Sequence, residues 1–249
     1  MTFPVIIHLG PLALHPHVVF ESLAYAIGAQ LHWQLRRRYG DVLSLEPRMW
    51  IITAAAVGAV LGSKLAHWVA DPSQTWYLML HDPQQLIQGK SIIGGLLGGL
   101  LAVEGIKRLL HIRQPTGDLF AIPLAVGIAV GRIGCFLTGL ADQTHGLPTS
   151  LPWGVDFGDG VHRHPTQLYE IVFLIGLAMW LRRRMGQPHE PGDSFKRFMI
   201  AYMSFRFAVE FLKPGVSMAG LAALQWLCLA ALVYYRRDLI RLFANPRSA

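Results

Sequence analysis

Two arginines are the residues of this chain best suited to bind an anion. Arg132 lies in the run GRIGCF and Arg206 in SFRFAVEF, and both runs stand in otherwise apolar stretches. A guanidinium stays protonated when partly buried, and its planar fork matches the oxygens of a phosphate or carboxylate. Two such groups in one cavity predict a site for the phosphate of a phospholipid. Two separate ion pairs, for example Arg206 with Glu210 one turn later, are the alternative.

Carboxylates and an imidazole supply candidate bases. Glu21, Glu170 and Glu210 stand in apolar stretches, where a carboxylate can act as a base, pair with an arginine or accept a structural hydrogen bond. No lysine or arginine lies one turn from Glu21, which favours a role beyond an ion pair. Asp142 and His145, in ADQTHG, form a plausible general-base pair. The predicted catalytic set is Glu21, Asp142, His145 and Glu210. Roles in helix packing or loop structure are the alternative.

Further polar groups are predicted to bind substrate. The run HPTQLYE can bind substrate or cap and anchor the helix that follows it. Cys135, one turn after Arg132, is either a reactive thiol or a small packed side chain. The predicted substrate-binding set is Arg132, Arg206, Cys135, His164, Gln167, Tyr169, Glu170 and Lys90. The remaining histidines lack metal-ligand spacing and no nucleotide fingerprint is present, so we predict neither a metal nor a cofactor.

Seven apolar stretches must position these residues. With 53% hydrophobic and only 15% charged residues, the chain is far less charged than a soluble domain. Each stretch approaches or exceeds the length needed to cross a bilayer, about 20 residues. They cover residues 18–35, 50–70, 91–110, 118–140, 166–181, 198–212 and 217–235. This pattern predicts an all-α, polytopic membrane protein with about seven transmembrane helices in one domain, residues 1–249.

The positive charge indicates topology rather than a nucleic-acid partner. Sixteen of the 22 lysines and arginines fall in alternate loops, and the intervening loops hold three. Since cytoplasmic loops carry the excess of Lys and Arg, we expect the N-terminus outside and the C-terminus in the cytoplasm. Residues 141–165 then form an outer, periplasmic loop, in which WGVDFGDG predicts a short hairpin with Trp153 and Phe157 at the headgroup level. A loop of this length is longer than a simple connection between two helices requires, so we expect it to shape a site.

These motifs together resemble the prolipoprotein diacylglyceryl transferase family. The strongest matches are GRIGCF at 131–136, RHPTQLYE at 163–170 and FRFAVEF at 205–211, with weaker ones at 10–15, at 93–99 and at Asp118. The resemblance implies a multi-pass enzyme of the bacterial inner membrane. It would transfer diacylglyceryl from phosphatidylglycerol to the lipobox cysteine of a lipoprotein precursor and release glycerol phosphate. Arg132, Arg206 and Glu210 match family positions needed for lipid binding or catalysis.

The chain also departs from the family pattern. Ile93 stands where the family has a histidine before its Gly-Gly pair, and Cys135 replaces the asparagine of GRxGN. The following Asn-Gly-Glu run becomes residues 138–140, Thr-Gly-Leu, and Glu21 replaces an early tyrosine. We interpret the chain as a divergent paralogue with rebuilt chemistry. A different acceptor for the lipid group and a non-catalytic lipid binder remain the alternatives; a transporter would show inverted repeats, which we do not find.

Overall fold

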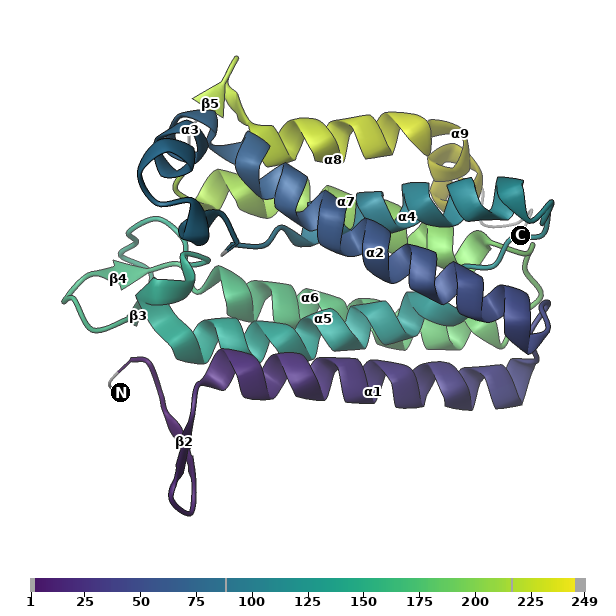
Figure 1. Cartoon of the computed structure of the whole chain (residues 1–249), viewed down its shortest axis with the longest axis horizontal. Helices are drawn as coiled ribbons and strands as arrows, with labels where there is room; N and C mark the ends of the chain where they lie inside the picture. The colour runs from purple at the N-terminus through teal and green to yellow at the C-terminus, as the bar shows by residue number, and fades with distance from the viewer. Residues whose placement is uncertain (1–2, 88, 216, 245–249) are drawn as a thin grey trace. The chain divides into compact units, whose positions relative to one another are not determined.

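The structure, a computed structural model, describes residues 3–87, 89–215 and 217–244. The chain is predominantly helical, which confirms the all-α prediction (Figure 1). It divides into two compact units, each built from separate segments. The first unit comprises residues 1–40, 117–214 and 238–249, and the second comprises residues 41–116 and 215–237.

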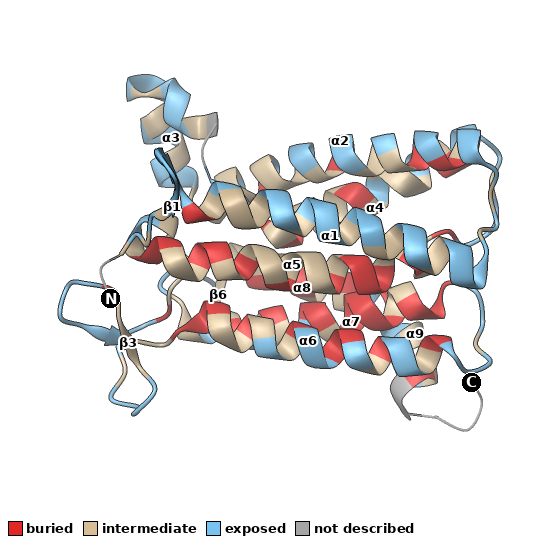
Figure 2. Ribbon diagram, turned by 90° about the horizontal axis from the view of Figure 1, so that it is seen from below, coloured by how far each residue is buried: buried red, intermediate tan, exposed pale blue. Residues whose placement is uncertain are grey.

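Four long helices form the first unit. They are α1 (Pro16–Tyr39), α5 (Asp118–Thr138), α6 (Thr166–Met185) and α7 (Asp193–Val209). Helix α5 packs against the other three, and its small buried residues Ala121, Ala125 and Ala129 allow close packing. Buried residues also run along α7 (Figure 2). The central position of α5 places Arg132 inside the unit.

Asp118 links the N-terminus of α5 to the N-terminus of α7 by hydrogen bonds. It is the first residue of α5, yet its carboxylate accepts the backbone N–H groups of Gly192 (2.6 Å) and Phe195 (3.1 Å) at the start of α7. Since Gly192, the N-cap of α7, has no side chain to accept these donors, Asp118 supplies the cap from another helix. This contact sets where α7, which carries Arg206, begins beside α5.

Short elements connect the helices of the first unit. They are β1 (Ile7–Leu9), β2 (Leu12–Leu14), η2 (Gly139–Asp142), β3 (Val155–Asp156), β4 (His162–Arg163) and η3 (Glu210–Leu212). The antiparallel pair β3–β4 confirms the predicted hairpin. At its tip the Asp156 carboxylate accepts the N–H groups of Gly158 and Gly160, which lowers the pKa of Asp156. Near the C-terminus α9 (Arg236–Leu239) leads into the π-helical turn η4 (Ile240–Ala244).

Phe157 does not lie where the sequence analysis placed it. Its side chain is only 3% exposed and packs against the tilted ring of Phe3, at 5.2 Å between ring centroids, and edge-on against Phe136, at 5.8 Å. The prediction that Phe157 lies at the headgroup level was wrong, because these two rings bury its side chain inside the protein. Trp153, by contrast, is 57% exposed.

The second unit is built on a close helix pair. It contains α2 (Leu45–Ala70), α3 (Pro72–His81), η1 (Pro83–Ile87), α4 (Ile92–Leu109), β5 (Ser217–Met218), β6 (Leu221–Ala222) and α8 (Ala223–Tyr234). A Cβ atom on Gly94 would lie 2.3 Å from the Gly62 carbonyl oxygen, and one on Gly98 would lie 2.3 Å from that of Gly58. Only glycine therefore fits along this contact, so the Gly-rich start of α4 packs directly on α2.

Each of the seven apolar stretches corresponds to one helix, from α1 to α8 with α3 excepted. By length and composition, two segments of the described chain, Leu45–Ala70 and Asp118–Asp142, qualify as bilayer-crossing helices. Apolar side chains also cover outward faces, and on α2 Val57, Val60 and Leu61 are each more than half exposed. Such surfaces are expected of helices that contact lipid.

Candidate active site

A buried ion cluster joins three helices of the first unit. Glu170 on α6 is 1% exposed, and its Oε2 lies 2.8 Å from Nε of Arg132 on α5 and 3.0 Å from Nη1 of Arg206 on α7. Tyr202 donates its hydroxyl to Glu170 Oε1 at 2.5 Å. The two arginines are therefore not in separate ion pairs, because they share one carboxylate.

Glu210 extends this cluster. It is the first residue of η3, directly after α7, and its Oε2 accepts from Nη2 of Arg206 at 3.1 Å, as the sequence alternative proposed. Arg206 Nε is buried and has no hydrogen-bond acceptor among the described residues. The cluster thus contains two guanidinium groups, two carboxylates and an unsatisfied donor. Such an arrangement can donate hydrogen bonds to the oxygens of an anionic ligand.

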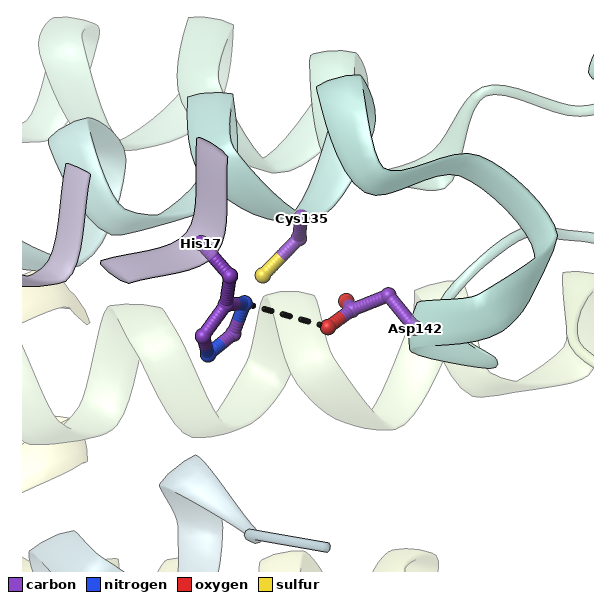
Figure 3. Close-up of side chains that lie close together, drawn as sticks. All are labelled: His17, Cys135 and Asp142. Carbon is purple, nitrogen blue, oxygen red and sulfur yellow. Dashed lines mark ion pairs between the residues drawn. The ribbon is translucent and has the colours of Figure 1, made fainter. Parts of the chain in front are cut away.

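A second polar group lies beside the ion cluster (Figure 3). It consists of His17 at the start of α1, Cys135 near the end of α5 and Asp142 at the end of η2. His17 Nδ1 lies 3.2 Å from Asp142 Oδ1, and the Arg132 Nη1 group donates to Cys135 Sγ at 3.8 Å. The Arg132 side chain therefore connects the two groups, with Glu170 on one side and the thiol on the other.

Residues around the second group hold its members in place. Glu21 Oε2 lies 3.6 Å from His17 Nε2, one helical turn later, and Tyr25 donates to Glu21 Oε1 at 3.3 Å. Thr144 donates its hydroxyl to Asp142 Oδ2 at 2.7 Å. Glu21 therefore holds the His17 ring through Nε2, and Thr144 holds the Asp142 carboxylate through Oδ2.

Comparison with known proteins identifies the scaffold. Residues 4–236 match the family model described as prolipoprotein diacylglyceryl transferase. The chain belongs to this family. A phosphatidylglycerol–prolipoprotein diacylglyceryl transferase of Bordetella bronchiseptica is 33% identical over 250 residues, covering 90% of this chain and 89% of its own. Similar enzymes of Methylococcus capsulatus (33% identical; 92% and 89% covered) and Geobacter sulfurreducens (32%; 88% and 85%) also match.

The family resemblance in Arg132, Arg206, Glu170 and Glu210 coincides with the ion cluster. The structure brings these four residues together from the three strongest sequence motifs. Tyr202 was not predicted, because a tyrosine in an apolar helix gives no signal of a partner 32 positions away. Three motifs that are far apart in the sequence thus contribute side chains to one cluster in this chain.

The predicted pair of Asp142 with His145 is not formed. Asp142 contacts His17 instead, and the described hydrogen bond of the His145 ring is to the Gly146 carbonyl at 3.1 Å. The prediction was wrong because η2 turns the Asp142 side chain back toward the start of α1. His17 was missed, although its position four residues before Glu21 could have indicated it.

The HPTQLYE residues divide between two roles. His164 Nδ1 lies 3.1 Å from the Tyr169 hydroxyl, which also accepts from Trp153 Nε1 at 2.9 Å. These three anchor the loop of residues 141–165 to α6. Gln167 is buried and donates to Thr144 at 3.1 Å, which links it to the Asp142 contact instead. Thr166 also donates to the Thr144 carbonyl at 2.7 Å, so two residues of this run contact the surroundings of the second polar group.

Lys90 and Ile93 belong to the second unit. Lys90 is exposed in the segment before α4, and Ile93 is buried in the first turn of that helix. Ile93 gives this turn of α4 an apolar side chain with no ionisable group. The assignment of Lys90 to the substrate site stays a prediction.

Proposed function

We propose that this chain transfers diacylglyceryl from phosphatidylglycerol to the cysteine thiol of a lipoprotein precursor. The observation that carries the proposal is the convergence of Arg132 and Arg206 on the buried carboxylate of Glu170. Relatives that are about one third identical over about nine tenths of the chain bear this activity in their names. The ion cluster supplies the anion site that such a reaction requires.

The arginines act on the leaving group. During transfer the bond between the terminal glyceryl carbon and the phosphate oxygen breaks, and negative charge grows on the departing glycerol phosphate. Guanidinium groups fixed before the reaction stabilise that charge without reorganisation. Glu170 and Tyr202 keep the two forks in place, so their role is positioning.

The second polar group and Glu21 beside it act on the acceptor cysteine. The acceptor sulfur must lose its proton as it forms the new carbon–sulfur bond. Glu21 is partly exposed and lies beside His17, so it can receive that proton. Asp142 holds the opposite side of the His17 ring at 3.2 Å. We assign Glu21 as the base in place of the Asp142–His145 pair.

The proposed setting is the bacterial inner membrane, with seven crossings, an outer N-terminus and a cytoplasmic C-terminus. Support comes from the alternation of basic loops and from the exposed apolar side chains of α2. The second polar group lies where α1 begins and α5 ends, which this topology places at the outer end of both helices. A precursor emerging from the membrane would meet the site there.

A different acceptor is the second candidate function. Cys135 stands where the family has asparagine, and it lies within the polar group assigned to the acceptor. Since the lipid-binding arginines are retained, this change points to the acceptor side. A chain that releases glycerol phosphate from phosphatidylglycerol without modifying the peptide would support this candidate. One that binds the lipid and releases nothing would be a non-catalytic binder.

Substitution of Arg206 by lysine tests the lipid side. Arg206→Lys keeps the charge but loses the fork, so kcat should fall by about 10²–10³-fold in transfer from phosphatidylglycerol to a lipobox peptide. Arg184→Lys is the matched control, because Arg184 lies in the last turn of α6 and its described hydrogen bond is to Gln187. An Arg206→Lys enzyme within about twofold of the control would contradict the assignment.

A further inference from the structure

The three side chains of the second polar group come from separate segments yet present three metal-ligating atoms to one point. His17 Nδ1, Cys135 Sγ and a carboxylate oxygen of Asp142 all lie within 4.8 Å of one another (Figure 3). Two ligands of one tetrahedral zinc ion are about 3.5 Å apart, given bond lengths of about 2.0–2.3 Å. The 3.2 Å between Nδ1 and Oδ1 already fits that spacing, and Cys135 Sγ lies within 4.8 Å of both other ligand atoms.

The surroundings match those of a metal centre. A metal-binding histidine usually gives its other ring N–H to a carboxylate, and Glu21 lies 3.6 Å from His17 Nε2. A ligating carboxylate is usually hydrogen-bonded on its free oxygen, and Thr144 donates to Asp142 Oδ2 at 2.7 Å. His17 Nδ1 itself is buried and makes no hydrogen bond of normal geometry among the described residues.

We propose that His17, Cys135 and Asp142 bind a zinc ion with one open coordination position. One thiolate, one imidazole and one carboxylate suit zinc better than the hard cations, which prefer oxygen. With the thiolate and the carboxylate each contributing one negative charge, the dication is neutralised by its own ligands. Arg132 close by does not oppose the ion, because its charge is compensated by Glu170 at 2.8 Å.

The sequence analysis predicted no metal, and that interpretation rested on spacing along the chain. His17 and Asp142 are separated by 125 positions, with Cys135 between them on another helix, so no short motif exists. The ligands meet only because α1 packs along α5 and η2 returns toward the start of α1. The same arrangement leaves one side of His17 and Asp142 partly exposed, which provides an entry path.

The open position gives the ion a role in the proposed transfer, and this role rests on the proposed function. A thiol that coordinates zinc is deprotonated and becomes a nucleophile at neutral pH. The acceptor cysteine would release its proton to Glu21 and attack the glyceryl carbon as a thiolate. The carbon–oxygen bond breaks and its electron pair leaves on glycerol phosphate, beside Arg132. The thioether that remains is a weaker zinc ligand than the thiolate, so the product can dissociate.

Direct metal measurements test the site without any assay of activity. The full chain, purified in detergent with its affinity tag removed, is stripped with a chelator and titrated with Zn²⁺ or Co²⁺. We expect about one ion per chain and, with Co²⁺, a thiolate charge-transfer band in the near ultraviolet. Cys135→Ser and His17→Ala should lose the band. Glu21→Gln should bind Zn²⁺ about 10–100-fold more weakly, because it keeps all three ligands and loses the carboxylate beside the His17 ring.

Cys228→Ser is the matched control, since Cys228 is the only other cysteine and lies on α8 of the second unit. It should keep both the band and the stoichiometry. A band that Cys135→Ser retains, or Zn²⁺ binding no tighter than in the His17→Ala variant, would overturn the proposal. Unchanged binding in Glu21→Gln would also contradict the arrangement described, while a folded state confirmed by circular dichroism keeps each loss interpretable.

Failure of the metal site and failure of the proposed function are distinguishable. Transfer to a lipobox peptide at full rate by chelator-stripped protein would refute the zinc ion and leave the transferase intact. Stoichiometric zinc binding through Cys135 with no transfer to the peptide would keep the site and refute the acceptor. Loss of transfer on stripping with recovery on adding Zn²⁺ would support both.

Discussion

Glu170 shows at the scale of one residue how the site depends on charge balance. Its carboxylate contacts Arg132, Arg206 and the Tyr202 hydroxyl, and all four groups are buried. A buried ion network contributes little net stability when complete, but removing one partner leaves an uncompensated charge. The arginines are therefore available for a ligand only while Glu170 holds them.

Glu170→Gln should destabilise the protein strongly. The amide keeps the shape but leaves two guanidinium groups without their shared counter-charge, so we expect a loss of about 3–5 kcal/mol in the free energy of unfolding. Denaturant unfolding in detergent measures it. The control is Glu190→Gln, which removes a mostly exposed ion pair with Arg241 and should cost less than about 1 kcal/mol. Equal losses for both variants would contradict the account.

Lys213, the residue that directly follows η3, should make lipid binding depend on pH. Burial, followed by repulsion from Arg206 and Arg132, lowers the pKa of Lys213 from 10.5 to about 7. A bound lipid phosphate favours the charged form of Lys213. Above about pH 7 this lysine is mostly neutral in the free enzyme, so lipid binding must be accompanied by uptake of one proton. The affinity for phosphatidylglycerol should therefore fall as pH rises above about 7, by up to about tenfold per pH unit.

Binding of labelled phosphatidylglycerol in micelles across this pH range measures the effect. Lys213→Arg provides the comparison, because arginine stays charged throughout. Its affinity should remain nearly constant over the same range. A pH profile that is identical in the two proteins would exclude Lys213 as its source.

At the scale of elements, the contact of α2 with α4 is the least tolerant part of the fold. Gly94→Ala would place a Cβ 2.3 Å from both the Gly62 carbonyl oxygen and the Ala66 Cβ, so the helices must move apart. We expect a loss of about 1–3 kcal/mol in stability, measured as a lower Tm in detergent. Gly105→Ala on the same helix meets nothing within 4 Å and should be neutral or slightly stabilising. Similar Tm values for the two variants would contradict this close contact.

The elements were more predictable from the sequence than the contacts between them. Each apolar stretch marks one helix because apolar length is a property of the local sequence. Helix α3 (Pro72–His81) was missed because its ten residues mix polar and aromatic side chains and fall below the length of a membrane span. Its boundary is nevertheless local, since the Asp71 side chain caps it by accepting from the Gln74 N–H.

The site was predictable only where both partners are close in the sequence. Arg206 and Glu210 were paired correctly because they stand four residues apart. The sharing of Glu170 by two arginines depends on how α5, α6 and α7 pack, which no spacing in the sequence encodes. Asp142 was assigned to the wrong histidine for the same reason, because the turn η2 directs it to a residue 125 positions earlier.

At the scale of the whole molecule, the alternation of basic loops predicts which ends of the helices face outward. A cysteine at exposed Asp159 in the outer loop should react with a membrane-impermeant maleimide on intact spheroplasts. One at exposed Arg183, in the last turn of α6, should react only after the membrane is permeabilised. The native Cys135 and Cys228 are buried, so the unsubstituted protein gives the background. Labelling of both positions from the same side would contradict the topology.

The measurement that tests the central claim most directly is a product balance by mass spectrometry. Purified protein receives labelled phosphatidylglycerol and a lipobox peptide, with a peptide in which serine replaces the lipobox cysteine as the control. The account predicts that the cysteine peptide gains diacylglyceryl while an equal amount of glycerol phosphate is released, and that the serine peptide gains nothing. Protein that is folded and binds the lipid, yet leaves the cysteine peptide unmodified, would contradict the proposed function.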